Sequence, residues 1–493
     1  MAPVSAGAPR GTRVGGAVLA LLACISLVSG CSRVISGTPT AEGGPAADDV
    51  AGLPVNDGPT GPRAGVADAD LAVEGTDRGE IDGLARNAVS DVQDYWKAEF
   101  PDAFDGKEFD PVGKFVSYDS TALGGALCGQ QTRGLSNAFY CGKEDLVAWD
   151  RADLLPRLNN SFGPIAVVTV LAHEMGHAVQ QRAGTVGEQD STLVSEQQAD
   201  CFTGSFFRHV AEGGAQHFQV STGDGLNKVM GVLSYIRDTP GESDFTGADA
   251  HGSAFDRVTA FQYGFSDGPK RCAEMDAEDV KQRTTQFRFW KQAQETDLPV
   301  DEKNLAAVQE SLRLVFKDTG ALPPHLVTEP LACAGVRSTS PVAYCPGTNT
   351  VSLSLDDLQR IATPPAKDDA NSGYGDFAAY AQVASRYALS VQEAAGLPLT
   401  GQNAGLRTAC MVGAWSGLLV EDPIGRRNPV GELRMAPGDI DEGVAALLGD
   451  DSLIAADVDG RQVPAGFARV EAFRLGFQDG FSPCSTQYSA GPA

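Results

Sequence analysis

The chain has 493 residues, of which 42% are hydrophobic and 21% charged, so it is long enough for two domains and apolar enough to build their cores. Its formal net charge is -26, and no cluster of lysine and arginine interleaved with aromatic residues occurs along it. This composition excludes an intrinsically disordered chain. It also argues against a nucleic-acid partner, because nothing is arranged to neutralise phosphates.

The first thirty residues are typical of a targeting segment. Basic residues precede an uncharged apolar run over 14–28, which is too short for a stable membrane span. The run ends in Leu-Val-Ser-Gly-Cys, which resembles a bacterial lipobox, so we predict a lipoprotein signal peptide over 1–30 and lipidation, including palmitate, on Cys31. Cys24 ends a similar string and is the second choice, and an ordinary secretory signal is the remaining alternative. The expected location is the extracytoplasmic face of the cell membrane.

Residues 31–78 are rich in Gly, Pro, Ala and Asp and have neither helical nor strand periodicity. We expect them to form a flexible tether between the lipid anchor and the folded part of the chain.

Eight further cysteines indicate disulfide bonds, since an even number in an exported chain is typical of a disulfide framework. Their separations repeat along the chain, which predicts four pairs: Cys128 with Cys141, Cys201 with Cys272, Cys333 with Cys345, and Cys410 with Cys484. No Cys-x-x-Cys string occurs, which argues against a zinc finger.

An internal repeat explains this spacing. Residues 255–272 align without gaps on residues 467–484, and ten of the eighteen positions are identical. We therefore predict two tandem copies of one domain, over residues 79–290 (the first half) and 300–485 (the second half).

The first half contains His-Glu-Met-Gly-His at 173–177. On a helix, positions i and i+4 share a face, so His173 and His177 can direct imidazole nitrogens at one metal ion, with Glu174 beside them. The preceding apolar run and Gly184 after the motif favour a helix that ends there. Two core histidines without a metal are the alternative.

Zinc in a catalytic site takes three protein ligands and leaves one position open. Glu196 follows on a second predicted helix and can supply the third ligand, and Asp200 lies one turn later, where it can bond the other ring nitrogen of a histidine such as His173. The metzincin pattern fails, because Gln180 and Ala183 stand where it requires glycine and a third histidine. Solvated helix charges are the alternative for both carboxylates.

The strings His-Glu-Met-Gly-His-Ala-Val-Gln-Gln, Glu-Gln-Gln-Ala-Asp-Cys-Phe-Thr-Gly, His-Gly-Ser and Ala-Phe-Tyr-Cys resemble the bacterial neutral zinc metallopeptidase family, which is similar to thermolysin-type gluzincins. The similarity covers most of residues 115–280. It implies an α+β, zincin-like fold, zinc held by His173, His177 and Glu196, Glu174 as the general base, and a peptide or protein substrate. A further donor is needed for the developing oxyanion. His251 is the first candidate, followed by Arg257 and Tyr140.

The second half lacks these groups. Alignment puts Ser385 and Leu389 opposite the two histidines of the motif, Gly405 opposite Glu196, and Val463 opposite His251. We therefore expect a degenerate pseudo-peptidase domain over 300–485 and one zinc ion per chain.

A membrane-anchored zinc peptidase is the function that these observations favour. The rival is a non-catalytic cell-surface binding or scaffold lipoprotein that keeps zinc structurally, and a zinc hydrolase of another substrate is a third possibility. The intact Glu174 favours the enzyme, because a structural zinc site needs no base.

Overall fold

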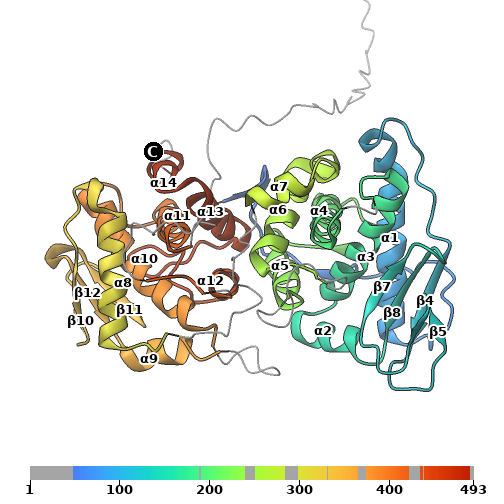
Figure 1. Ribbon diagram of the computed structural model, residues 1–493, viewed down its shortest axis with the longest axis horizontal. Coiled ribbons are helices and arrows are strands. Elements are labelled where there is room, and N and C mark those ends of the chain that lie inside the picture. The colour runs from blue at the N-terminus through green and yellow to red at the C-terminus, as the bar shows by residue number, and fades with distance from the viewer. Residues whose placement is uncertain are drawn as a thin grey trace, which may run out of the picture. The chain divides into compact units, whose positions relative to one another are not determined.

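The computed structural model describes residues 48–187, 190–238, 250–283, 298–329, 331–364, 373–420, 433–436 and 438–488 (Figure 1). The predicted signal peptide and Cys31 lie outside these residues. Within the described part of the chain, no helix combines the length and apolar character needed to cross a membrane.

Residues 48–78, which we expected to belong to a flexible tether, are packed against the fold. They include β1 (Asp49–Val50), β2 (Leu53–Pro54) and β3 (Gly61–Pro62). The backbone N–H of Asn56 bonds the hydroxyl of Thr222, and the Arg63 guanidinium donates to the carbonyls of Ala215 and Phe218. These contacts reach more than 150 positions along the sequence, so the prediction was wrong for this segment.

The first half combines helices with a small mixed sheet, in agreement with mixed α and β content. Its helices are α1 (Glu80–Ala103), α2 (Leu154–Phe162), α3 (Ile165–Ala183), α4 (Thr192–Ala211), α5 (Asp224–Tyr235), α6 (Ala254–Ala273) and α7 (Ala277–Arg283). Its strands are β4 (Lys114–Tyr118), β5 (Ala126–Leu127), β6 (Gln130–Gln131), β7 (Ala138–Cys141), β8 (Leu146–Asp150) and β9 (Phe218–Gln219). The main sheet has the order β4-β8-β7, with β4 and β8 parallel and β7 antiparallel at the edge.

The helix α3 is the centre of this half. Fifteen of its nineteen residues are buried, as expected for a helix that is apolar on all sides, and it contacts α1, α4, α5 and β7. It ends at Gly184, whose φ of 75° is the left-handed conformation that glycine adopts without strain. The HExxH motif therefore sits on a rigid, enclosed element.

The helices α4 and α6 pack closely because both carry glycine at the contact. A side chain at Gly204 would collide with the carbonyl of Phe261, and one at Gly264 with the carbonyl of Cys201. This close approach brings the residues at the start of α6 next to those of α4 that face the metal motif.

The second half has the same sheet topology. Its strands are β10 (His325–Val327), β11 (Val342–Cys345) and β12 (Thr350–Leu353), in the order β10-β12-β11, with the first pair parallel and the second antiparallel. Its helices are α8 (Glu302–Val315), α9 (Leu355–Ile361), α10 (Asp376–Ala394), α11 (Gln402–Leu419), α12 (Asp439–Leu448), α13 (Gly466–Asp479) and α14 (Ser482–Gln487), with short 3-10 turns at Lys317–Thr319 and Pro346–Thr348. The helices α12 and α13 contact α5 and α6 of the first half (Figure 1).

All four expected disulfide pairs are bonded: Cys128 with Cys141, Cys201 with Cys272, Cys333 with Cys345, and Cys410 with Cys484. The bonds lie within the halves, never between them. Each of the two long-range bonds joins its partners across a Cα separation of 5.4 Å, an ordinary distance for a disulfide.

Peptide mapping without reductant should therefore recover these four linked pairs and no others, because each pair is held in bonding range by the packing of its own half. A linked peptide that joins a cysteine of residues 79–290 to one of residues 300–485 would contradict this prediction.

Candidate metal centre

Three side chains from two helices converge in the first half. The α3 helix carries His173 and His177 one turn apart, and α4 directs Glu196 between them. The Glu196 carboxylate lies 3.1 Å from Nε2 of His173 and 3.3 Å from Nε2 of His177. These donor atoms all lie within 4.8 Å of one another.

The arrangement fits a zinc ion. Ligand atoms held at about 2.0 to 2.2 Å from one tetrahedral zinc lie about 3.3 Å apart, close to the separations found for Glu196 and the two histidines. Two imidazoles and one carboxylate are a donor set of catalytic zinc sites, which leave a fourth position for water or substrate. Both imidazoles present the same nitrogen, Nε2, to the common point.

The other ring nitrogen of His173 is fixed by a buried ion-pair network. Nδ1 lies 2.8 Å from the Asp200 carboxylate, which in turn accepts two hydrogen bonds of 2.9 Å from the Arg257 guanidinium. Asp200 and Arg257 are fully buried. A carboxylate on Nδ1 sets the tautomer that leaves Nε2 free to bind a metal, and it makes the imidazole a better ligand.

Gln180 has the corresponding role at His177. Its Oε1 lies 2.9 Å from Nδ1 of His177, and its amide donates to the carbonyl of Ser195 at the start of α4. The sequence identified Gln180 only as a residue that breaks the metzincin pattern. Its position three residues after His177, on the same helix face, is the signal that could have revealed this contact.

Glu174 lies beside the cluster and is held by the edge strand. The backbone N–H of Tyr140 in β7 donates to its Oε2 at 2.9 Å. Burial raises the pKa of Glu174, although the two neighbouring histidines and this hydrogen bond lower it. The side chain is only partly buried, so it is oriented but still accessible.

The charges of the cluster are strongly coupled. Burial lowers the pKa of His173, but the carboxylates of Asp200 and Glu196 outweigh this and raise it to about 10. Burial raises the pKa of Glu196, and the two histidines overcome it and hold the pKa well below its usual range. Without a metal the carboxylates thus favour the protonated form of the imidazoles. A bound cation replaces those protons, because histidine binds metals in its neutral form.

The three candidates for an oxyanion donor have different surroundings. His251 lies just before α6, where its backbone N–H and its ring contact Asp238, and its side chain is 45% exposed. No hydrogen bond among the described residues joins it to the cluster. The Arg257 guanidinium is engaged with Asp200 and with the carbonyl of Ile236, so it supports His173 instead of facing a substrate. The expectation for Arg257 is therefore corrected.

The hydroxyl of Tyr140 is also engaged. It contacts the side chains of Asp145, Gln181 and Arg182, and Arg182 pairs with Asp145 at 2.9 Å. This network fixes the end of α3 to the turn between β7 and β8. Tyr140 thus acts on the cluster through its backbone N–H to Glu174, and its hydroxyl has no contact there.

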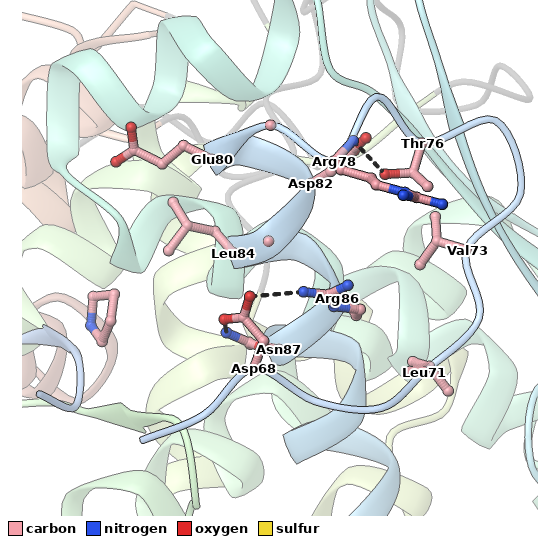
Figure 2. A pocket seen from close by; sticks show the side chains of 13 residues that line it. Asp68, Leu71, Val73, Thr76, Arg78, Glu80, Asp82, Leu84, Arg86 and Asn87 are labelled. Carbon is pink, nitrogen blue, oxygen red and sulfur yellow. Dashed lines mark hydrogen bonds and ion pairs between the residues drawn. The ribbon is translucent and has the colours of Figure 1, made fainter. Parts of the chain in front are cut away.

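A pocket of about 680 Å³ lies elsewhere, between the first turns of α1 and the segment that precedes it (Figure 2). Both charge signs line it, and Arg86 pairs with Asp68 across 2.8 Å within it. None of His173, His177 and Glu196 is part of it. This mixed lining favours no class of ligand.

The second half has a buried arginine in α10, the helix that the sequence alignment pairs with α3. Arg386, which aligns with Glu174, is fully buried in α10. Its guanidinium donates to the Ser385 hydroxyl and to the carbonyls of Leu453, Ala456 and Asp457 at 2.9 to 3.2 Å. A buried cation with four acceptors thus lies at the sequence position that aligns with Glu174.

A second acidic group, Asp376, Asp439 and Glu442, lies at the start of α10 and α12. Each carboxylate already accepts a backbone N–H, from Leu298, Ala436 and Phe377 respectively. The set contains no histidine or cysteine, so it does not resemble a zinc site.

The cluster of His173, His177 and Glu196 has the donor set of one class of zinc sites, two histidines and one glutamate. Glu174 lies beside it. Residues 49–275 match the family model described as "Putative neutral zinc metallopeptidase", and this confirms the resemblance of the sequence motifs to that family.

Curated relatives share parts of this segment. The uncharacterized protein YpfJ of Escherichia coli K12 is 28% identical over 195 residues, covering 34% of this chain and 65% of the relative. An uncharacterized protein of Mycobacterium tuberculosis is 26% identical over 164 residues, covering 29% of this chain and 56% of the relative. The chain thus spans a little over half of the mycobacterial relative's length. No solved structure matches the chain.

Proposed function

We propose that the first half is a zinc-dependent peptidase that hydrolyses peptide bonds. The observation that carries this proposal is the convergence of Nε2 of His173, Nε2 of His177 and the Glu196 carboxylate beside an oriented, accessible Glu174. A structural zinc site needs no such base and usually has all four positions filled by the protein.

The groups at the cluster have different roles in hydrolysis. Zinc, when bound, supplies a Lewis acid that polarises the scissile carbonyl and lowers the pKa of a water molecule. Glu174 takes a proton from the attacking water and returns it to the leaving amine, and its raised pKa brings it closer to the range in which both transfers are easy. The Tyr140 backbone N–H keeps the carboxylate aimed at the water.

A mixed peptide library tests the activity directly. The purified protein should cleave peptides, and a chelator should stop cleavage until zinc is added back. Zinc binding without any cleavage would instead favour the rival function, a non-catalytic surface lipoprotein with a structural zinc ion.

We further propose that the second half is a degenerate copy of the first. Support comes from the shared sheet topology and from matched local contacts at positions that the alignment pairs. Tyr140 contacts Asp145 and Gln181, and Tyr344 contacts Asn349 and Glu393 at the aligned positions. Close glycine contacts repeat as well, at Gly413 against Phe473 and at Gly476 against Cys410. The buried Arg386 cation opposes binding of a metal cation in this half.

Anchoring to the membrane by a lipid on Cys31 remains our proposal for the N-terminus, and it rests on the lipobox-like string alone. Replacing Cys31 with Ala should move the protein from the membrane fraction to the soluble fraction, because the acylated thiol is lost. Cys24→Ala is the matched control and should stay in the membrane fraction. A lipid mass on Cys24 would show that the wrong cysteine was chosen.

A further inference from the structure

One side chain of the second half reaches into the first. Asp441 of α12 is buried, with 1% of its side chain exposed. Its Oδ1 accepts the backbone N–H of Phe255 in the first turn of α6 at 3.2 Å, and its Oδ2 lies 3.3 Å from Nε of Arg237, just after α5. A side-chain acceptor at a helix N-terminus satisfies a backbone N–H that has no partner within the helix. Asp441 therefore holds the end of α5 and the start of α6 together.

Short contacts connect this point to the metal centre. Arg257 lies one half-turn after Phe255 on α6. Its Nη1 donates to the carbonyl of Ile236 at 3.1 Å, and its Nε and Nη2 donate to Asp200. Asp200 holds Nδ1 of His173. The position of the first turn of α6 thus sets the position of the Arg257 guanidinium. Arg257 in turn orients the Asp200 carboxylate, which orients the ring of His173.

The contacts between the halves come in matched pairs. Phe255 packs on Phe477 with ring centroids 5.2 Å apart, and the aligned residues Phe467 and Phe265 pack at 5.3 Å. Such reciprocal contacts are typical of an interface with twofold symmetry.

Asp441 has a counterpart in the first half, although the N–H that the counterpart accepts lies one residue earlier in the alignment. Asn227 of α5 accepts the backbone N–H of Gly466, in the first turn of α13, at 2.7 Å. Each half therefore caps a helix of the other. The two caps differ in what they connect to. The helix α6 carries Arg257, which contacts the residues that hold the metal ligands. The helix α13 belongs to the half in which Ser385 and Leu389 replace the histidines.

We propose that the second half completes the metal centre of the first, and that Asp441 is a positioning residue for His173 that acts through α6, Arg257 and Asp200. This inference rests on the proposed function of the cluster as a zinc site. On this proposal, the function of the degenerate half is to support the metal centre of the same chain.

The environment of Asp441 supports a role beyond simple packing. Its Oδ2 is buried, and within the described residues no aligned hydrogen-bond donor reaches it, since Arg237 is near it without the geometry of a hydrogen bond. A buried carboxylate oxygen without a donor is costly. Removing the side chain would also leave the Phe255 N–H in the first turn of α6 without this acceptor, so that turn could shift.

Zinc affinity of full-length variants tests the inference, measured with zinc alone by competition against a chromophoric chelator. Asp441→Ala should weaken zinc binding by about 3- to 10-fold, which is less than the roughly 10- to 100-fold expected for a residue that bonds a ligand directly. Asn227→Ala is the matched control. It removes the symmetrical cap and should lower the melting temperature similarly, but zinc affinity should stay within about twofold of wild type.

Two results would overturn the inference: zinc affinity in Asp441→Ala within about twofold of wild type, or a loss of zinc affinity that is equal in Asp441→Ala and Asn227→Ala. If Asp441→Ala does not fold, Asp441→Leu decides. It nearly keeps the volume of the buried side chain and removes the acceptor for Phe255, so weaker zinc binding than wild type supports the proposal and unchanged binding refutes it. A wild-type protein that binds no zinc would instead refute the proposed function itself.

Discussion

Glu174→Gln is expected to leave zinc bound and to lower peptide hydrolysis by about 10²- to 10⁴-fold, the usual contribution of a general base. The ligand set His173, His177 and Glu196 is untouched by this change. The amide oxygen of glutamine can still accept the Tyr140 N–H, so the side chain should keep its orientation. What is lost is the ability to take and return a proton.

The measurement is turnover of a cleaved peptide together with zinc content for the same preparation. Glu144→Gln provides a matched control, because it removes one exposed carboxylate from the nearby turn between β7 and β8 without touching the cluster. Unchanged turnover in Glu174→Gln would eliminate this residue as the base. Loss of zinc in that variant would show that Glu174 also supports the ligands.

Glu196→Ala is expected to lower zinc affinity more than Asp200→Ala. Glu196 lies within 3.3 Å of both Nε2 atoms, so its removal deletes a ligand. Asp200 touches only the far nitrogen of His173, and the loss of such a partner typically costs about 10- to 100-fold in metal affinity. The order of the two effects distinguishes a ligand from its support.

Asp200→Ala should carry a second effect that Glu196→Ala does not. It leaves the Arg257 guanidinium buried without its carboxylate, and breaking a buried ion pair in this way costs about 3 to 5 kcal/mol of folding free energy. Denaturant unfolding measures that loss. The isosteric variant Asp200→Asn should lose less folding free energy than Asp200→Ala, since one acceptor remains. Equal zinc affinities for the Glu196 and Asp200 variants would mean that the third ligand is elsewhere.

The parts of the site that could be predicted from the sequence are those formed by residues close together in the sequence. The i and i+4 spacing of His173 and His177 needs only helical geometry, and Glu196 and Asp200 follow one turn apart on the next helix. The cysteine pairs could be predicted for a different reason, because their spacing recurs in both halves.

The contacts that were missed are those that only tertiary packing creates. Residues 48–78 have the composition of a linker, but Arg63 finds carbonyl acceptors at Ala215 and Phe218, which no local pattern reveals. Arg257 was expected to face a substrate. It is instead buried against Asp200, because the glycines of α4 and α6 let the two helices approach closely. Asp441 lies in a segment whose sequence has no metal motif at all.

The zinc content of the purified full-length chain decides whether the assigned ligands are right. We expect one tightly bound zinc ion per chain, and its loss in Glu196→Ala, because the second half offers Ser385, Leu389 and Gly405 at the aligned positions and buries the Arg386 cation in α10. Elemental analysis that finds two tightly bound zinc ions per chain, or one that persists after Glu196 is removed, would contradict both the assigned ligands and the interpretation of the second half as a degenerate copy.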